Sequence, residues 1–225
     1  MTGGYNAAVG DYSAAFGENT FVLHDHSFVC GSNNLVDWKE SFAAGSNNKV
    51  YDQRSLVVGG NNIAGIKGRC AEQEKEEEEN NIPEGNRKII GYNAVFGQNN
   101  SALSTHGFIS GYNNTIAEAG TTHSGIIGMG NYIGNGGWYS FVAGLNNISH
   151  NNGAMVLGAG LISSSNYSLT VGRLNKEVSG GLFVVGNGTG DVKECSINQT
   201  TNQIEYKGAT PANAFVVYQD GHAEV

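Results

Sequence analysis

Glycines recur along this chain of 225 residues at a fixed interval of 14 residues. Each follows a short apolar triplet, as in SFAAG (41–45). The exceptions are an interval of 38 after Gly59, one of 17 before Gly128 and one of 16 before Gly144. A register held over so much of the chain indicates a repeat protein in which each unit stacks on the next. The anchor glycines are Gly17, Gly31, Gly45, Gly59, Gly97, Gly111, Gly128, Gly144, Gly158, Gly172 and Gly186.

The repeat unit has the composition of short strands joined by tight turns. An apolar triplet is too short for a helix, and its β-branched residues favour a strand. The Gly-x-Asn-Asn sequence that follows is typical of turns, because Gly and Asn tolerate left-handed backbone angles. Fourteen residues therefore predict one coil of a parallel β-solenoid, with two short strands and two turns. Stacked coils would place the first asparagine of each pair in a structural ladder, namely Asn33, Asn47, Asn61, Asn99, Asn113 and Asn146.

Both faces of the triplet strand are apolar. Side chains alternate along a strand, so Phe42 and Ala44 point one way and Ala43 the other. The same pattern holds in most other coils, where middle positions such as Val57 and Val142 and flanking positions such as Leu56 and Phe141 are apolar. A coil this small buries one face within itself, and an apolar stripe on the other face would be a large adhesive patch. We therefore expect an obligate oligomer.

Composition excludes several classes of protein. Apolar residues make up 39% of the chain, which argues against disorder, and the 34 glycines follow no Gly-X-Y triplet, which argues against collagen. No apolar run approaches the ~20 residues of a membrane helix, so we expect no membrane insertion. The net charge is −8 and lysine and arginine form no cluster, so we expect no nucleic-acid binding.

Catalytic and metal-binding motifs are absent from the sequence. The three cysteines, Cys30, Cys70 and Cys195, have no C-x-x-C spacing and predict neither a disulfide framework nor a zinc site. No G-x-S-x-G, H-E-x-x-H or Walker motif occurs. We expect no catalytic residues, no metal, no cofactor and no enzymatic activity. The opening residues, 1–10, have no basic and apolar stretch of the kind found in signal peptides.

The repeats resemble the heads of trimeric autotransporter adhesins, the YadA-like family. The resemblance rests on SFVCG, SFAAG, SLVVG and SFVAG at a 14-residue period, and on AAVGDYSAAFG (7–17). It covers residues 3–189 and implies a left-handed parallel β-roll, three of which associate about a common axis as a homotrimer. We accordingly expect an all-β chain with a β-roll domain at 1–189. The resemblance also implies an alternative function, the passenger head of an adhesin on the bacterial cell surface.

The C-terminal sequence favours a different setting for these repeats. Residues 182–225 resemble the segment of bacteriophage tail fibres and tailspikes in which a YadA-like roll gives way to a C-terminal region. Residues 190–225 leave the repeat and read as alternating strands with an Asp220-Gly221 turn, so we expect a small β cap. The resemblance implies a virion protein that presents a rigid rod to a host-surface receptor, either a glycan or a protein. A second alternative is part of a tailspike polysaccharide depolymerase.

The long interval after Gly59 holds an insertion at about 65–88. It carries six glutamates in the eight positions 72–79 and predicts a solvated acidic loop or a short frayed helix. Aromatic residues at turns are the better candidates for ligand binding, because Tyr and Trp are enriched in binding hot spots and present flat apolar faces. The candidates are Tyr132, Trp138, Tyr139, Tyr112 and Trp38.

Overall fold

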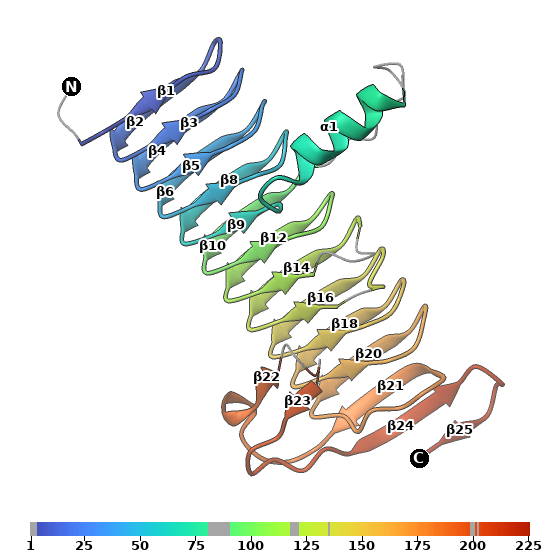
Figure 1. The fold of residues 1–225 in the computed structure, drawn as a ribbon. Helices are drawn as coiled ribbons and strands as arrows, with labels where there is room; N and C mark the ends of the chain where they lie inside the picture. The colour runs from blue at the N-terminus through green and yellow to red at the C-terminus, as the bar shows by residue number, and fades with distance from the viewer. Residues whose placement is uncertain (1–3, 81–90, 118–121, 135, 199–200, 202) are drawn as a thin grey trace. The chain divides into compact units, whose positions relative to one another are not determined.

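The computed structural model is an all-β solenoid of about 12 turns of about 14 residues each, with one α-helix among the residues that the structure describes (Figure 1). This confirms the predicted 14-residue coil. Contacts divide the chain into two compact units, residues 1–107 and residues 108–225, which we describe separately as unit 1 and unit 2. The structure describes residues 4–80, 91–117, 122–134, 136–198, 201 and 203–225.

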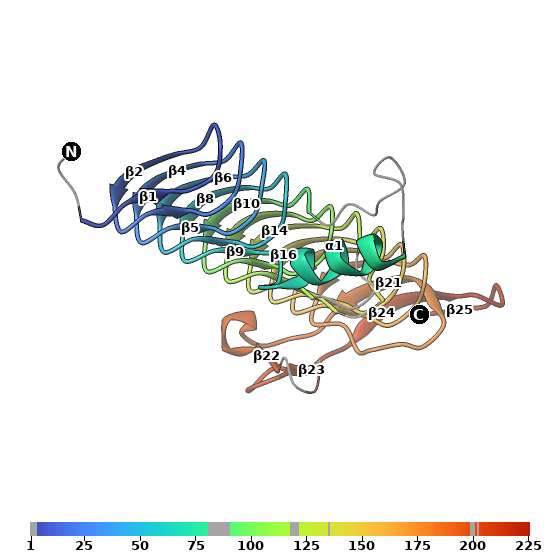
Figure 2. The ribbon, with the colours of Figure 1, turned by 45° about the horizontal axis from the view of Figure 1, so that its top comes forward.

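Each coil of unit 1 contributes one strand of five residues and one of two residues. The long strands form a parallel sheet in the order β2-β4-β6-β8-β10, and the short ones a second parallel sheet in the order β1-β3-β5-β7-β9-β11. Figure 2 shows the coils of unit 1, in blue to green, running side by side. The long strands are β2 (Ala14–Glu18), β4 (Phe28–Ser32), β6 (Phe42–Ser46), β8 (Leu56–Gly60) and β10 (Ala94–Gln98). The short strands are β1 (Ala7–Ala8), β3 (Phe21–Val22), β5 (Leu35–Val36), β7 (Lys49–Val50), β9 (Ile63–Ala64) and β11 (Ser101–Ala102).

Unit 2 continues the same pattern and then leaves it. Its long strands are β12 (Phe108–Tyr112), β14 (Gly125–Met129), β16 (Phe141–Leu145), β18 (Met155–Ala159), β20 (Leu169–Arg173) and β21 (Gly181–Asn187). Its short strands are β13 (Thr115–Ile116), β15 (Tyr132–Ile133), β17 (Ile148–Ser149) and β19 (Ile162–Ser163). After β21 the chain forms a hairpin of β22 (Ser196–Asn198) and β23 (Gln203–Glu205), and then β24 (Asn213–Tyr218) and β25 (Ala223–Glu224). Strand β24 pairs antiparallel with β21, and β25 with β24.

The anchor glycines lie in register because no other residue fits their position. Gly31, Gly45 and Gly59 are paired across β4, β6 and β8. Gly45 has a φ of 113°, and a Cβ built on it would overlap the carbonyl oxygen of Gly59 in the next coil. The same overlap recurs at the other anchors within each unit up to Gly172. Close approach of neighbouring backbones therefore explains the spacing of glycine in the sequence.

The core of each coil is narrow and mostly apolar, with a few buried Ser and Thr side chains in unit 2. The middle residue of each triplet, such as Val29, Ala43, Val57 or Val95 in unit 1, has no exposed surface. It faces the second residue of the short strands, such as Val36, which is also fully buried. Burying a valine or isoleucine side chain contributes about 1.5–3 kcal/mol, and nearly every coil buries at least one valine or isoleucine in this way.

A ladder of buried asparagine amides crosses the interior of the turns, and it is formed by the second asparagine of each pair. Asn48 Nδ2 donates to Asn34 Oδ1 (3.1 Å), to the Ala44 carbonyl (3.0 Å) and to the Gly59 carbonyl (2.9 Å). The Asn48 backbone N–H also donates to Asn34 Oδ1 (2.9 Å). These amides satisfy the backbone groups that the turn leaves unpaired. The buried ladder residues are Asn34, Asn48, Asn62, Asn100, Asn114, Asn131 and Asn147.

The first asparagines, which the sequence predicts as the ladder, have a different main role. Asn33, Asn47, Asn61, Asn99, Asn113 and Asn146 all adopt left-handed backbone angles, with φ between 53° and 57°. Some of them also bond across coils: Asn61 Nδ2 donates to Asn99 Oδ1 at 2.7 Å, and Asn33 Oδ1 accepts from Asn19 Nδ2 at 3.3 Å. They provide the turn conformation, which asparagine tolerates better than other non-glycine residues.

The insertion after β9 begins as a helix rather than a loop. Helix α1 spans Arg69–Glu79 and starts after Gly68, whose φ is 87°. Cys70 and Glu77 are its buried residues, and the other glutamates are more exposed. Residues 81–88 of the predicted insertion lie outside the described residues.

Replacing one anchor glycine tests the close approach of the coils. We expect Gly45→Ala to lower the free energy of unfolding by more than about 3 kcal/mol, because the new Cβ overlaps a backbone carbonyl that the sheet holds in place. Gly60→Ala is the matched control, since the nearest atom to its Cβ is Ser46 Oγ at 3.5 Å. Thermal and urea unfolding of both variants would give the comparison. Equal stabilities would contradict the assigned role of the glycine column.

The asparagine pair offers a second comparison between neighbouring residues. Asn48→Ala removes the three hydrogen bonds that Asn48 Nδ2 donates. It also leaves the backbone N–H and the Nδ2 of the buried Asn62 without the Asn48 Oδ1 acceptor. We expect a loss of about 2–4 kcal/mol in the free energy of unfolding, since each unsatisfied buried group costs about 1–3 kcal/mol. Asn47→Gly should be nearly neutral, because glycine adopts its left-handed φ of 56° freely. Urea denaturation would measure both changes, and a larger loss in Asn47→Gly would overturn the assignment.

Candidate functional site

The long strands of each unit present an apolar face outward, which we call the apolar face. It consists of the residues that flank the buried middle position. In unit 1 the rings of Phe28 and Phe42 are stacked with centroids 5.3 Å apart, and Leu56 is 38% exposed. In unit 2 the exposed members include Phe108, Ile127 and Met155. The exposed apolar side chains of adjacent coils are in register, so each unit carries a stripe and not scattered residues.

A second column of side chains lies at one turn, five residues before each anchor glycine. We call it the edge ladder. All its non-glycine members have left-handed φ angles between 54° and 60°. Its rings stack in pairs, with centroids 5.3 Å apart for Tyr12 and His26, and 5.4 Å apart for His123 and Tyr139. The members are Tyr12, His26, Glu40, Arg54, Tyr92 and His106 in unit 1, and His123, Tyr139, Gly153 and Tyr167 in unit 2.

Two of the predicted ligand-binding residues lie on this edge in unit 2. Tyr139 is 65% exposed, and the preceding Trp138 is 45% exposed. Tyr167, two coils further along the ladder, is exposed as well. The Trp138 backbone is held by Asn152, whose Oδ1 accepts from the Trp138 N–H at 3.2 Å. These three residues, which we call the edge aromatics, form a solvent-exposed aromatic surface suited to weak recognition.

Trp38 lies apart from the other predicted residues, in unit 1. Its ring packs against that of His24 in the preceding coil, with centroids 4.6 Å apart and an interplanar angle of 46°. The side chain is half-buried. This contact assigns Trp38 to packing between coils, and the structure places no other predicted aromatic beside it in unit 1.

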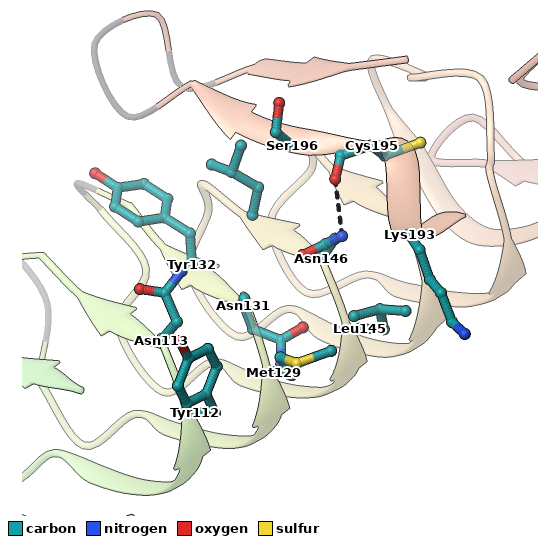
Figure 3. A pocket seen from close by; sticks show the side chains of 12 residues that line it. Tyr112, Asn113, Met129, Asn131, Tyr132, Leu145, Asn146, Lys193, Cys195 and Ser196 are labelled. Atoms are coloured by element: carbon teal, nitrogen blue, oxygen red, sulfur yellow. Dashed lines mark hydrogen bonds between the residues drawn. The ribbon is translucent and has the colours of Figure 1, made fainter. Parts of the chain in front are cut away.

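The remaining two predicted residues, Tyr112 and Tyr132, line one cavity of about 430 Å³ in unit 2, which we call the Tyr112 pocket. One wall comes from the ends of three long strands and the turns that follow them; the other comes from the chain around β22. Figure 3 shows Tyr112, Met129 and Leu145 on one side and Cys195 and Ser196 on the other. Tyr132 is only 7% exposed, and burial raises the pKa of its hydroxyl.

The floor of the Tyr112 pocket is a column of residues that directly follow the anchor glycines. Tyr112, Met129 and Leu145 are paired in register as the last residues of β12, β14 and β16. The same column is polar or glycine in unit 1, where it holds Glu18, Ser32, Ser46, Gly60 and Gln98. The change to apolar residues occurs in coils that border the C-terminal segment.

Asn146 joins the two walls of the pocket. Its Nδ2 donates to the carbonyls of Val192 (3.2 Å) and Cys195 (2.9 Å). Gly130 makes room for this side chain, because a Cβ there would overlap Asn146 Oδ1. Thus Asn146 fixes the C-terminal segment over the coils, in addition to its place at a turn.

The sequence did not reveal Lys193, Ser196 and Ile197 as pocket residues. They lie more than 80 positions after Tyr112 in the chain, beyond the last repeat glycine, where spacing no longer places residues in space. One sequence signal could have indicated the pocket. The residue after the anchor glycine is polar or glycine up to Gln98 and becomes apolar at Tyr112 and Met129.

A second group of functional side chains is buried where helix α1 meets the coils of unit 1. Asp52 has no exposed surface; Arg69 donates to its Oδ2 at 2.6 Å and Asn93 at 3.0 Å. Burial raises the pKa of Asp52 to about 6, and the Arg69 guanidinium opposes the rise. The Cys70 Sγ lies 3.8 Å from Asp52 Oδ1, and burial raises the pKa of this thiol to about 12. Arg69 also donates to the Leu103 carbonyl (2.6 Å), so the cluster holds α1 in place.

Neither site has the features of a reaction centre. The pKa of the Cys195 thiol at the pocket is also raised by burial, so both buried thiols, Cys70 and Cys195, stay protonated and are poor nucleophiles at neutral pH. Within the described ranges, no group of three or more His, Cys, Asp or Glu residues is arranged to hold a metal ion. The described part of the chain also contains no helix long and apolar enough to cross a membrane.

No protein-family model matches the chain, and no curated protein matches its sequence. The features of the structure that bear on function are therefore the apolar face, the edge aromatics and the Tyr112 pocket.

The buried carboxyl of Asp52 predicts a measurable pH dependence. Its pKa is about 6 in the folded chain, against an ordinary value of 3.8, so the folded chain holds the proton more tightly. The contribution of this group to stability is therefore full below pH 3.8 and is lost as the pH rises through 6.

Carbon-13 NMR of the Asp52 carboxyl should show a midpoint near 6. The free energy of unfolding of the wild type, relative to Asp52→Asn, should be larger at pH 5 than at pH 7.5. A midpoint near 3.8, or a difference that shrinks on acidification, would contradict the assignment.

Proposed function

We propose that this chain is a structural and adhesive segment of a homotrimeric fibre, in which the apolar faces of three chains meet. The observation that carries the proposal is the apolar face, a register-matched stripe of Phe, Leu, Ile and Met side chains that a single chain leaves partly exposed. Monomeric soluble proteins rarely keep such a contiguous apolar surface. Closed cyclic association buries the same face of every chain at once.

The proposed number of three chains and the left-handed sense of the roll follow from the resemblance to YadA-like repeats. A parallel solenoid with in-register coils is compatible with a stiff fibre, because each coil is hydrogen-bonded to the next along both sheets. We further infer that residues 190–225 act as a β cap. The antiparallel pairing of β24 with β21 supports this role, since the last coil would otherwise expose a strand edge.

The attachment surface that we propose is the edge aromatics, Trp138, Tyr139 and Tyr167. They are exposed at a turn and away from the strand positions that form the apolar face. Three copies of such a surface on one assembly would strengthen weak individual contacts through avidity. Flat aromatic faces suit a host-surface glycan, and a location in the virion of a phage tail would match this role. No catalytic role is proposed.

The mass in solution tests the assembly. We expect about 71 kDa, three times the chain mass of 23.6 kDa, from light scattering coupled to size exclusion. Leu56→Glu places a charge on the apolar face and should reduce the mass toward that of one chain. Gln98→Glu is the matched control, because it adds the same charge at an exposed polar strand end and should leave the mass unchanged. A folded wild-type monomer would contradict the proposal, and so would a Leu56→Glu variant that keeps the full mass.

A further inference from the structure

We propose that the Tyr112 pocket is a binding site for a small acidic saccharide, a mono- or disaccharide that carries a carboxylate. This inference deepens the proposed attachment role, and it rests on that role for its biological meaning. The site itself lies within unit 2 and is formed by residues of one chain.

The floor of the pocket includes apolar side chains that are exposed to solvent and are not part of the hydrophobic core. Tyr112 is 46% exposed and Met129 is 45% exposed. Leu145, next in the same column, is instead half-buried and packs against the hydrophobic cluster that includes Ile162 and Leu174. Leu145 therefore serves packing, whereas Tyr112 and Met129 form an apolar ledge in front of it. In unit 1 the same column is polar or glycine, so the coil folds without apolar residues at this position.

The dimensions of the ledge and the cavity suit a sugar. Side chains in adjacent coils repeat at the strand spacing of about 4.8 Å, so the pocket floor from Tyr112 to Leu145 is roughly 10 Å long. A pyranose ring has one face of C–H groups that packs on an aromatic or thioether surface, and its hydroxyls need polar partners at the rim. A cavity of 430 Å³ is within the usual range of small-ligand sites, about 300–1,000 Å³.

Asn146 offers a fixed acceptor for a ligand hydroxyl. Both of its strong amide contacts use Nδ2, toward the carbonyls of Val192 and Cys195, so the orientation of the amide is set. Among the described residues no donor is hydrogen-bonded to its Oδ1, which lies over Gly130 in the pocket wall. Asn113 adds a second amide to the lining, one coil beyond Gly130. Few well-placed polar groups on a mostly apolar surface are typical of specific ligand sites.

Lys193 indicates that the ligand is acidic. Its side chain starts on the wall formed by the C-terminal segment and extends past Leu145, at the end of the pocket opposite Tyr112 (Figure 3). No carboxylate of the described residues lies within ion-pair distance of its Nζ. Of its two acidic neighbours, Asp191 accepts from the Lys193 backbone N–H at 2.9 Å, and Glu194 Oε2 lies toward Gly208. An uncompensated ammonium group in a chain of net charge −8 favours a carboxylate as its partner.

Digalacturonate and its neutral analogue galactobiose are suitable probes. With the full chain, we expect saturation-transfer NMR and calorimetry to show binding of digalacturonate at least 10-fold tighter than binding of galactobiose. Lys193→Gln should remove this preference, since a hydrogen bond to a charged group contributes about 1.5–3 kcal/mol, equivalent to about 10-fold or more in affinity. Tyr112→Ala should abolish binding of both sugars. Both residues are exposed, so the variants should fold, and circular dichroism would verify this.

Tyr12→Ala is the matched control, because it removes an exposed tyrosine of unit 1 that belongs neither to the pocket nor to the edge aromatics. Binding that persists in Tyr112→Ala, or is lost in Tyr12→Ala, would overturn the proposed site. No binding of either sugar, or equal binding of both, would overturn the ligand class. The assembly is tested independently by mass: a trimer that ignores digalacturonate would contradict only the pocket proposal. A monomer that binds it would contradict only the fibre proposal.

Discussion

The close backbone contact between anchor glycines of successive coils is the constraint on which the rest of the structure depends. Because Gly45 lies directly against the Gly59 carbonyl with a positive φ, each coil must copy the path of its neighbour. In-register stacking then follows for every other position. The buried asparagine ladder and the edge ladder each take one residue per coil, and the core takes one residue from the long strand and one from the short strand.

This repetition has a consequence for association. Once one face of the long strand points into a narrow core, the flanking residues of successive coils must form a stripe on the other face of each unit. Apolar residues at those positions create a contiguous apolar surface rather than isolated exposed side chains. If the proposed assembly covers this stripe, the turns and the C-terminal segment remain available for binding a ligand. The edge aromatics and the Tyr112 pocket occupy those two places.

The sequence was sufficient for the coil but not for the details of its turns. Glycine spacing and the apolar triplet predicted the parallel solenoid, which the structure confirms. The first asparagines, predicted as a turn ladder, do lie in the turns, and some of them bond across coils. The buried ladder of the second asparagines was not predicted, because the two residues of each pair are chemically identical. Two features of the sequence could have identified the second asparagine. Asn34 lies two positions before the core residue Val36, so both side chains point to the same face of the strand. In the coil where Gly130 replaces the first asparagine, the second one is retained as Asn131. The Asp52 cluster and the far wall of the pocket depend on contacts across an insertion and beyond the last repeat, for which spacing gives no information.

The most direct test of the proposal that other chains cover the apolar face uses a cysteine that the chain already contains. Cys30 flanks the core position Val29 on the apolar face and is partly exposed in a single chain, whereas Cys70 and Cys195 are buried. Maleimide labelling of the native assembly, followed by mass spectrometry, would report whether another chain covers Cys30. The account predicts that Cys30 is protected in the assembly and becomes reactive when Leu56→Glu separates the chains. Rapid labelling of Cys30 in the native wild type, at the rate of an exposed thiol, would contradict it.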